Sequence, residues 1–364
     1  MNRTTTLRTI AATAACSLAF AACGGSSEAD EQRTLTFTIL VGERSPIGEL
    51  WDWWLGEVEE RTEGELAFDR YWDSTLMGTT ETIQGLNDGR ADIGQVEPSN
   101  NTGKFPLTSV GELPFETSNA AALAQALGEL GRTEGSALAE EWAGHALTPL
   151  AWSIGTSSGF ATNVPIETAE DLQGLSLRAT DRGSRVLESV GANLINVELA
   201  EIYGSMERGL IDGIYGIPFG FTGPLKYPEV ADHFTDLGLG VSTVHALAMS
   251  QDTWASLSSS QQAVIEEVSL EVPAKIAEIE RRWEEESCDA VEVAGDTASV
   301  LAPEESAKIE AAGKADVFAA WAEEVEAKGG DAEAFYDEYR RALDEAVADH
   351  ETFQTGVERC AGRG

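Results

Sequence analysis

Basic side chains, cysteine and proline are scarce in this 364-residue chain, and each shortage argues against a class of protein. The 24 Lys and Arg stand against 63 Asp and Glu, so the formal net charge is −39. Such a surface repels a phosphate backbone, which argues against nucleic-acid binding, and it repels an anionic ligand unless one cation is held back for it. The 11 prolines and 36 glycines are too few for collagen or a disordered linker. With 42% hydrophobic residues, the chain can bury the cores of one or two domains.

Strings that mark common catalytic and metal sites are also missing. The sequence holds no HExxH, CxxC or glycine–lysine phosphate loop, and its histidines (His145, His233, His245 and His350) are scattered, so we expect no metal and no cofactor. One catalytic string is present, because residues 155–159 (GTSSG) match the nucleophile elbow G-x-S-x-G after an apolar strand. That mechanism needs a helix directly after the serine, and residues 160–165 (FATNVP) do not form one. A serine hydrolase using Ser157 is therefore the weakest alternative, and the chain is not expected to be an enzyme.

The N-terminus has the pattern of an export signal. Arg3 and Arg8 precede an apolar stretch at 9–22 that is too short to span a bilayer, and Cys23 follows small residues. We expect removal of residues 1–22, which leaves a charge of 22 − 63 = −41, lipidation of Cys23, and a flexible tether up to residue 33. The alternative is ordinary signal cleavage. The predicted location is the cell envelope, with membrane contact through the lipid anchor alone.

Two cysteines remain after the signal segment, Cys288 and Cys360. In an exported protein an even pair suggests a disulfide, which would join the C-terminal tail to a long acidic helix. The alternative is two independent thiols. No further cysteine remains to build a metal set.

The spacing of apolar residues predicts an α/β protein with mainly parallel sheets flanked by helices. Strands are expected at 34–41, 65–71, 91–96, 147–154, 175–178, 213–217 and 241–249. Helices are expected at 46–64, 79–88, 120–142, 168–172, 181–190, 200–208 and within 303–350, and one from Ser258 to about Cys288 with a kink at Pro273. We expect residues 34–152 with 241–285 to form one lobe and residues 153–240 with 286–364 the other, with the long helix spanning both.

Arg178 is the cation that stands out, because it ends the strand predicted at 175–178. Ligands of open α/β sheets bind outside the carboxyl ends of the strands, and a guanidinium can pair with a carboxylate through two hydrogen bonds. The alternative is a surface salt bridge with one of the many acidic residues.

Several segments resemble, in order, the solute-binding subunit of TRAP transporters (the DctP-like family). Residues 168–178 (TAEDLQGLSLR) are similar to its P-x-x-D-L-x-G-x-x-x-R signature, and residues 209–213 (GLIDG) to its G-x-V-D-G segment. Further similarities lie at 86–93, 103–107, 112–115 and 190–193, so the resemblance covers about residues 34–290. It implies a two-lobed periplasmic-binding-protein-like fold that closes around a small organic acid. It also implies delivery to small and large permease subunits driven by an ion gradient; an ABC-type or sensory ligand-binding protein is the runner-up.

The sequence departs from the family pattern at two places. Ala161 stands where many members have an arginine, and residues 214–219 (IYGIPF) are apolar where many have an asparagine. Sialic-acid and C4-dicarboxylate specificity are therefore not carried over, and an acid with one carboxylate and an apolar remainder fits better. The residues expected to bind it are Arg178 as carboxylate clamp, Tyr215 and Phe219 over the apolar part, Ser157, Ser158 and Phe160 at the crossover between lobes, and Glu97 and Asn100 against a hydroxyl or a cation. The alternative for Tyr215 and Phe219 is the core of the lobe.

Overall fold

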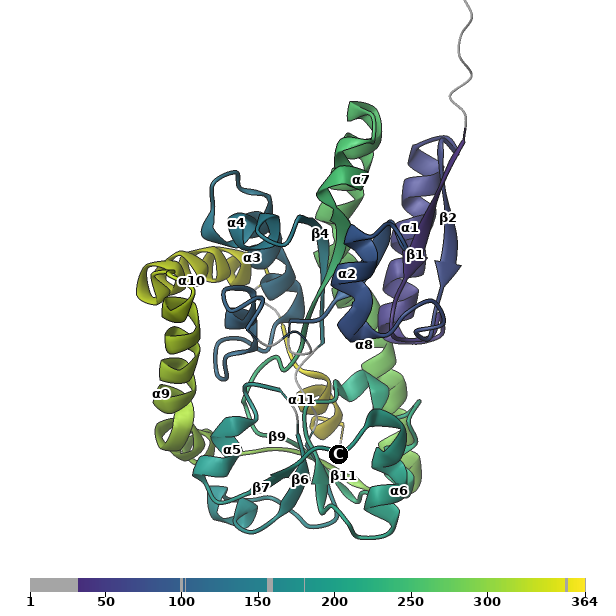
Figure 1. Ribbon diagram of the computed structural model, residues 1–364. Coiled ribbons are helices and arrows are strands. Elements are labelled where there is room, and N and C mark those ends of the chain that lie inside the picture. The colour runs from purple at the N-terminus through teal and green to yellow at the C-terminus, as the bar shows by residue number, and fades with distance from the viewer. Residues whose placement is uncertain are drawn as a thin grey trace, which may run out of the picture. The chain divides into compact units, whose positions relative to one another are not determined.

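The computed structural model describes residues 32–98, 101, 103–155, 160–179, 181–350 and 353–363 (Figure 1). The signal segment and Cys23, and also Asn100, Ser157 and Ser158, lie outside the described residues. The expected α/β class is confirmed, and the strands form two separate sheets with helices packed on them.

The first sheet has the strand order β2-β1-β3-β10-β4. Its strands are β1 (Arg33–Thr38), β2 (Leu66–Tyr71), β3 (Ile93–Val96), β4 (Leu147–Ile154) and β10 (Val244–Ser250). β1 runs parallel to β2 and β3, whereas β10 runs antiparallel to both β3 and β4. The helices that precede or follow these strands are α1 (Pro46–Arg61), α2 (Thr82–Asn87), α3 (Ala120–Arg132), α4 (Ala137–Ala143) and α7 (Gln251–Ala255).

The second sheet has the order β11-β9-β5-β8-β6-β7 and consists of short strands. They are β5 (Phe160–Thr162), β6 (Ser176–Arg178), β7 (Asn193–Ile195), β8 (Gly213–Ile214), β9 (His233–Asp236) and β11 (Thr297–Val300). β6 is parallel to both neighbours, β7 and β8, whereas β5 is antiparallel to β8 and β9. Two short helices, α5 (Arg185–Ser189) and α6 (Ile202–Glu207), belong to this part of the chain. Both sheets are therefore mixed, because the chain crosses from one sheet to the other after β4 and returns before β10.

One helix expected as continuous is two helices. The prediction of a single helix at 120–142 was wrong, because α3 ends at Arg132 and α4 begins at Ala137. Gly135 has a φ of 78°, which a helix cannot contain, and Ser136 caps α4 by accepting a hydrogen bond from the Ala139 N–H. The turn between α3 and α4 therefore contains both a residue that ends a helix, Gly135, and a residue that caps the start of the next one, Ser136.

The long helix α8 (Ser259–Ala294) passes both sheets. Ser258 forms the predicted capping box with Gln261, and the helix continues through Pro273 to Ala294, six residues beyond its expected end. Near its start Ser269 accepts a hydrogen bond from the Trp54 indole of α1, and near its end Ser287 donates one to Gly220 in the second half of the chain. The expectation that this helix spans both parts is confirmed.

The C-terminal helices connect the same two parts from another side (Figure 1). α9 (Pro303–Ala327) packs against α5 at Gly313, where an added Cβ would lie 2.5 Å from Ser189 Oγ, and its Trp321 donates a hydrogen bond to the Pro106 carbonyl at 2.7 Å. α10 (Ala332–Asp349) packs on α3, and α11 (Gly356–Ala361) on the end of α8. α10 thus joins the first sheet's helices, although we grouped residues 286–364 with the other lobe; the division into lobes stays a prediction.

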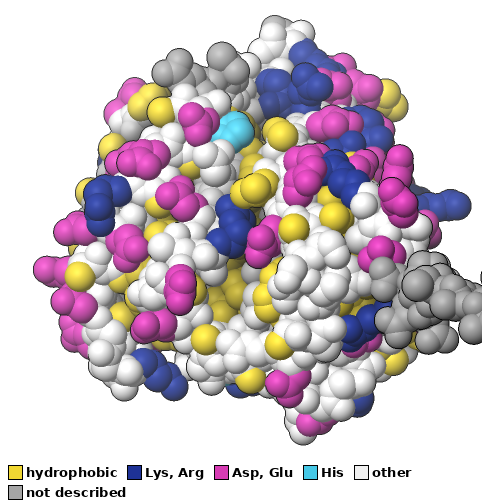
Figure 2. All heavy atoms as spheres, turned by 90° about the horizontal axis from the view of Figure 1, so that it is seen from above, with side chains coloured by type: hydrophobic (Ala, Val, Ile, Leu, Met, Phe, Trp, Pro, Cys, Tyr) yellow, Lys and Arg dark blue, Asp and Glu magenta, His cyan; other side chains and the backbone are white. Residues whose placement is uncertain are grey.

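Acidic side chains are spread over the face of the molecule seen in Figure 2, with basic ones between them. In the described part of the chain no helix is long and apolar enough to cross a membrane.

Candidate functional site

Arg178 lies at an edge where three parallel strands end. It is the last residue of β6, and its side chain is buried, with the residue 9% exposed. Nε donates a hydrogen bond to the Val197 carbonyl at 3.2 Å and Nη1 donates one to the Tyr215 carbonyl at 3.4 Å. These carbonyls follow β7 and β8, so the guanidinium is positioned at the carboxyl edge of the sheet by backbone atoms. Burial lowers the pKa of Arg178 below its ordinary value, and the nearby Tyr227 and Asp181 oppose that shift.

Asp181 is the acidic neighbour of this guanidinium. Its Oδ1 accepts a hydrogen bond from the Ser184 N–H at 2.7 Å, and its Oδ2 has no hydrogen-bond partner among the described residues. Gly216 makes the approach possible, because a Cβ there would lie 2.6 Å from Asp181 Oδ2 and 3.7 Å from Arg178 Nη1. Burial raises the pKa of Asp181 to about 6, against the opposing effects of the Ser184 hydrogen bond and of Arg178.

A second polar group comes from the first sheet. Glu97 directly follows β3 and is 4% exposed. Its Oε1 accepts a hydrogen bond from Gln95 Nε2 at 3.2 Å, and Gln95 in turn accepts one from the Trp51 indole. His245 Nε2 lies 3.8 Å from the same Glu97 oxygen. Burial lowers the pKa of His245 although Glu97 opposes this, so the imidazole is neutral near pH 7.

Glu112 ends a 3-10 helix (Thr108–Glu112) and faces a cavity of about 70 Å³. The residue is 1% exposed, and its Oε1 has no hydrogen-bond partner within the described ranges. Burial, followed by the charge of Asp181, raises the pKa of Glu112 to about 8, while Arg182 and a backbone hydrogen bond from Val244 oppose the shift. Glu112 therefore interacts electrostatically with Asp181, which follows β6 of the second sheet, and more weakly with Glu97, which follows β3 of the first.

The cavity beside Glu112 is built from both parts of the molecule. One wall follows β3, the other follows β6, and α9 adds a single residue; the lining is Pro98, Gly103, Phe105, Pro106, Ser109, Glu112, Asp181, Arg182, Arg185 and Glu324. Arg182 donates hydrogen bonds to Glu324 at 2.5 and 3.1 Å, so its charge is matched by a carboxylate of α9. A larger cavity of about 660 Å³ lies between α8, the start of α3 and residues 348–359, and contains none of the residues expected from the sequence.

The structure brings together some of the expected residues and separates others. Tyr215 lies beside Arg178 and its ring is 6.4 Å from that of Phe160, and both rings are buried. Glu97 comes from the first sheet, directly after β3. Phe219 is instead fully buried in the core of the second part, 6.3 Å from the Phe234 ring, which is the alternative that we considered for it.

Sequence reasoning missed Asp181 and Glu112. Asp181 stands three residues after Arg178, and Glu112 opens the segment ELPF that we noted as similar to a family motif. Neither position carries a pattern of its own, because their interaction depends on how the two sheets face each other.

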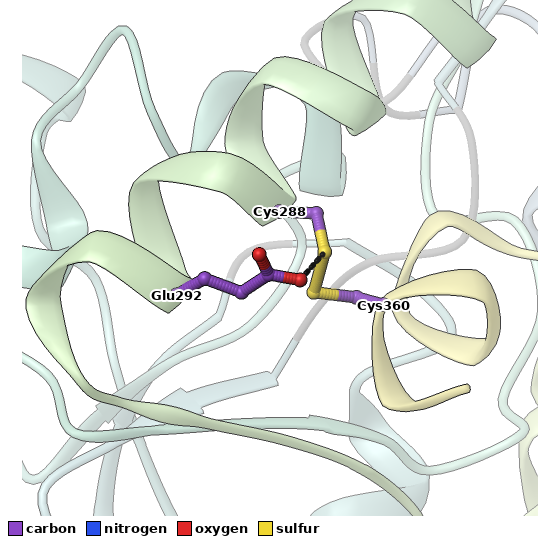
Figure 3. Close-up of side chains that lie close together, drawn as sticks. All are labelled: Cys288, Glu292 and Cys360. Carbon is purple, nitrogen blue, oxygen red and sulfur yellow. Dashed lines mark hydrogen bonds between the residues drawn. A yellow bond between two sulfur atoms is a disulfide. The ribbon is translucent and has the colours of Figure 1, made fainter. Parts of the chain in front are cut away.

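Cys288 and Cys360 are joined by a disulfide, as the even count predicts, with sulfurs 2.09 Å apart (Figure 3). The Glu292 carboxylate lies 3.7 Å from Cys288 Sγ. Two sulfurs and a carboxylate this close resemble a set of metal ligands. Both sulfurs are bonded to each other, however, so neither is a thiolate, and the group fastens α11 to α8.

Comparisons with known proteins agree with this fold. Residues 37–324 match the family model DctP, described as bacterial extracellular solute-binding protein, family 7. A solute-binding protein of Chromohalobacter salexigens is 27% identical over 246 residues, covering 66% of this chain and 70% of that protein. The 2,3-diketo-L-gulonate-binding periplasmic protein YiaO of Escherichia coli is 30% identical over 158 residues, or 43% of this chain and 47% of YiaO. A TRAP solute-binding protein of Rhodoferax ferrireducens in complex with copurified benzoate superimposes with a TM-score of 0.77 at 22% identity, over 88% of this chain and 100% of that one, which shows a shared fold.

Proposed function

Since the chain belongs to the DctP family of bacterial extracellular solute-binding proteins, family 7, we propose that it captures a small organic acid between its two sheets for a TRAP transporter. The family is one of extracellular transport proteins, and we propose no catalytic role for Ser157. Acids are the ligands named for two similar proteins, benzoate in the Rhodoferax structure and 2,3-diketo-L-gulonate for YiaO.

The observation that carries the proposal is the state of Arg178. It is a buried guanidinium at a strand edge, and within the described ranges it makes hydrogen bonds to two backbone carbonyls and no ion pair within 4.0 Å. A buried charge is normally paired, and a ligand carboxylate would supply the missing partner through a charge-assisted hydrogen bond. Closure around the ligand would exclude water and strengthen this pair, because Coulomb attraction grows as the local dielectric falls.

Capture and delivery require two states. The acid must bind the closed arrangement more tightly than the open one, or it shifts no population. We propose that the closed, loaded form is recognised by the small and large permease subunits. We also propose that the signal segment 1–22 directs export, and that lipidation at Cys23 anchors the chain to the membrane, so that it stays near those subunits.

The test is the affinity of the Arg178→Gln variant for benzoate, phenylacetate and glucuronate, measured by calorimetry on protein stripped of copurified ligand. For the acid that wild type binds, we expect at least a tenfold loss, because a hydrogen bond to a charged group contributes about 1.5–3 kcal/mol. Arg208→Gln changes an exposed arginine at the end of α6 and serves as control. Unchanged affinity in Arg178→Gln, or tight binding of neutral sugars and of no acid, contradicts the proposal.

A further inference from the structure

We propose that the captured acid is a zwitterion, whose ammonium or other protonated amine is held by the carboxylates of Glu112 and Asp181 while Arg178 holds its carboxylate. This inference rests on the proposed function, because it names the class of acid that the same site takes. It adds a second, oppositely charged recognition element to the cleft.

The first ground is that two buried acceptors point at one space. Glu112 ends a 3-10 helix between β3 and β4, and Asp181 follows β6; they are 1% and 6% exposed, and both line the cavity of about 70 Å³. Glu112 Oε1 and Asp181 Oδ2 are both without a hydrogen-bond partner among the residues that the structure describes. Buried polar atoms are almost always hydrogen-bonded, so these two acceptors indicate a donor supplied from outside the chain. The Nε of Arg182, in the same lining, is also without a partner in the described part of the chain and indicates an acceptor beside that donor.

The second ground is the balance of charge around that cavity. Arg182 and Arg185 also line it, and the two terminal nitrogens of Arg182 are used by Glu324. His245 adds no positive charge, because burial lowers its pKa. The cavity is therefore lined by three carboxyls, those of Glu112, Asp181 and Glu324, and by two guanidiniums. Of these carboxyls only Glu324 has an ion pair within 4.0 Å among the described residues, so Glu112 and Asp181 remain for a cation that the ligand supplies.

The third ground is the position of Asp181 between the two recognition elements. A Cβ at Gly216 would touch Asp181 Oδ2 at 2.6 Å and Arg178 Nη1 at 3.7 Å, so that carboxyl is a direct neighbour of the guanidinium and also lines the cavity. A small molecule with a cationic and an anionic group a few bonds apart matches this spacing. The raised pKa values of Glu112 and Asp181 agree with this arrangement, because an ammonium placed beside them would restore their charged forms.

The experiment compares acids that differ only in an amine. The full chain is titrated calorimetrically with three pairs: cyclohexanecarboxylate and piperidine-2-carboxylate, phenylacetate and phenylglycine, and 3-phenylpropionate and phenylalanine. We expect the amine-bearing member to bind at least tenfold more tightly in every pair that binds. Equal or tighter binding of the amine-free members overturns the zwitterion and leaves the proposed function standing, provided that Arg178→Gln weakens their binding. Tight binding of glucuronate or benzoate with no binding of any amine-bearing member overturns the zwitterion alone, whereas tight binding of neutral sugars and of no acid overturns the proposed function as well.

Two variants separate recognition of the amine from general damage. Glu112→Gln keeps the shape of the side chain and removes its charge, so it should weaken binding of the amine-bearing member at least tenfold and leave its partner unchanged or tighter. Glu116→Gln is the matched control, because that buried carboxylate is paired with Lys314 and Arg340 outside the cavity. Equal losses for both members in Glu112→Gln contradict the inference. So does a tighter binding of the amine-free acids on addition of calcium that is reversed by a chelator, because the cation would then be a metal.

Discussion

Glu112 and Glu116 stand four residues apart and both have buried side chains, yet their surroundings are opposite. The Glu116 side chain is 3% exposed and accepts hydrogen bonds from Arg340 at 2.9 Å and Tyr336 at 3.0 Å, with the Lys314 ammonium 3.5 Å away. Glu112 is 1% exposed, and after burial itself the charge that shifts its pKa most is the like charge of Asp181. The Glu116 carboxylate connects its loop to α9 and α10. The charged form of Glu112, in contrast, is destabilised by its surroundings, as its raised pKa indicates.

A paired carboxylate like that of Glu116 is also found far along the chain, at the junction of α8 and α11. At the α8–α11 junction the buried Glu284 pairs with Arg359, beside the Cys288–Cys360 disulfide. Buried charges are normally paired in this way, and strongly perturbed ones gather at functional sites. The paired carboxylates Glu116 and Glu284 therefore stabilise the fold, whereas the perturbed carboxyls of Glu112 and Asp181 fit the ligand-binding role that we propose for them.

Removing the disulfide should have the largest effect on stability and none on the cleft. In a Cys288→Ser, Cys360→Ser variant we expect the free energy of unfolding to fall by about 4 kcal/mol, since the bond closes a loop between residues 72 apart. Urea unfolding measures the loss, and calorimetry should give unchanged ligand affinity. A loss below about 1 kcal/mol would contradict the expected effect of loop closure, and weaker ligand binding by folded protein would show that the two regions are coupled.

Stability should depend on pH through Glu112. Its pKa is raised from 4.5 to about 8 in the folded state, so folding retains a proton that the unfolded chain releases. Glu112 therefore leaves stability unaffected below about pH 4.5 and reduces it as pH rises toward 8, by about 3 kcal/mol in total between pH 5 and 8. The measurement is urea unfolding of wild type and Glu112→Gln at several pH values.

The free energy of unfolding of Glu112→Gln should fall less steeply with pH than that of wild type. The difference between the two curves measures the contribution of Glu112. Glu141 also has a pKa raised by burial, to about 7, but it is present in both proteins and cancels. If the two proteins lose stability equally with pH, a group other than Glu112 causes the loss, and Glu112 does not differ from Glu116 in the way described above.

The strongly patterned parts of this fold were predictable from the sequence, and four of its short strands were not. β4 (Leu147–Ile154) has the predicted bounds, and β2 differs by one residue, because long apolar or alternating runs specify strands locally. β5, β7, β9 and β11 have three or four residues each and were missed, since pairing with neighbouring strands stabilises them more than their own composition does.

The candidate site divides in the same way. Arg178 was predictable from a strand end and a family signature, and the disulfide from an even cysteine count; the role of Arg178 in binding stays a prediction. Glu112 and Asp181 were not predictable, because nothing in a linear sequence says that two carboxyls 69 residues apart line one cavity.

The smallest expected effect tests the Glu112–Glu116 contrast directly. Glu116→Gln leaves the Arg340 and Lys314 charges without their carboxylate, and because those side chains are about one-third exposed we expect a loss of about 2 kcal/mol in the free energy of unfolding. Glu112→Gln removes a poorly satisfied group, so at pH 7 it should leave stability unchanged or raise it. Urea unfolding at pH 7 measures both. A larger loss for Glu112→Gln than for Glu116→Gln would mean that the cleft carboxyl is a structural group as well.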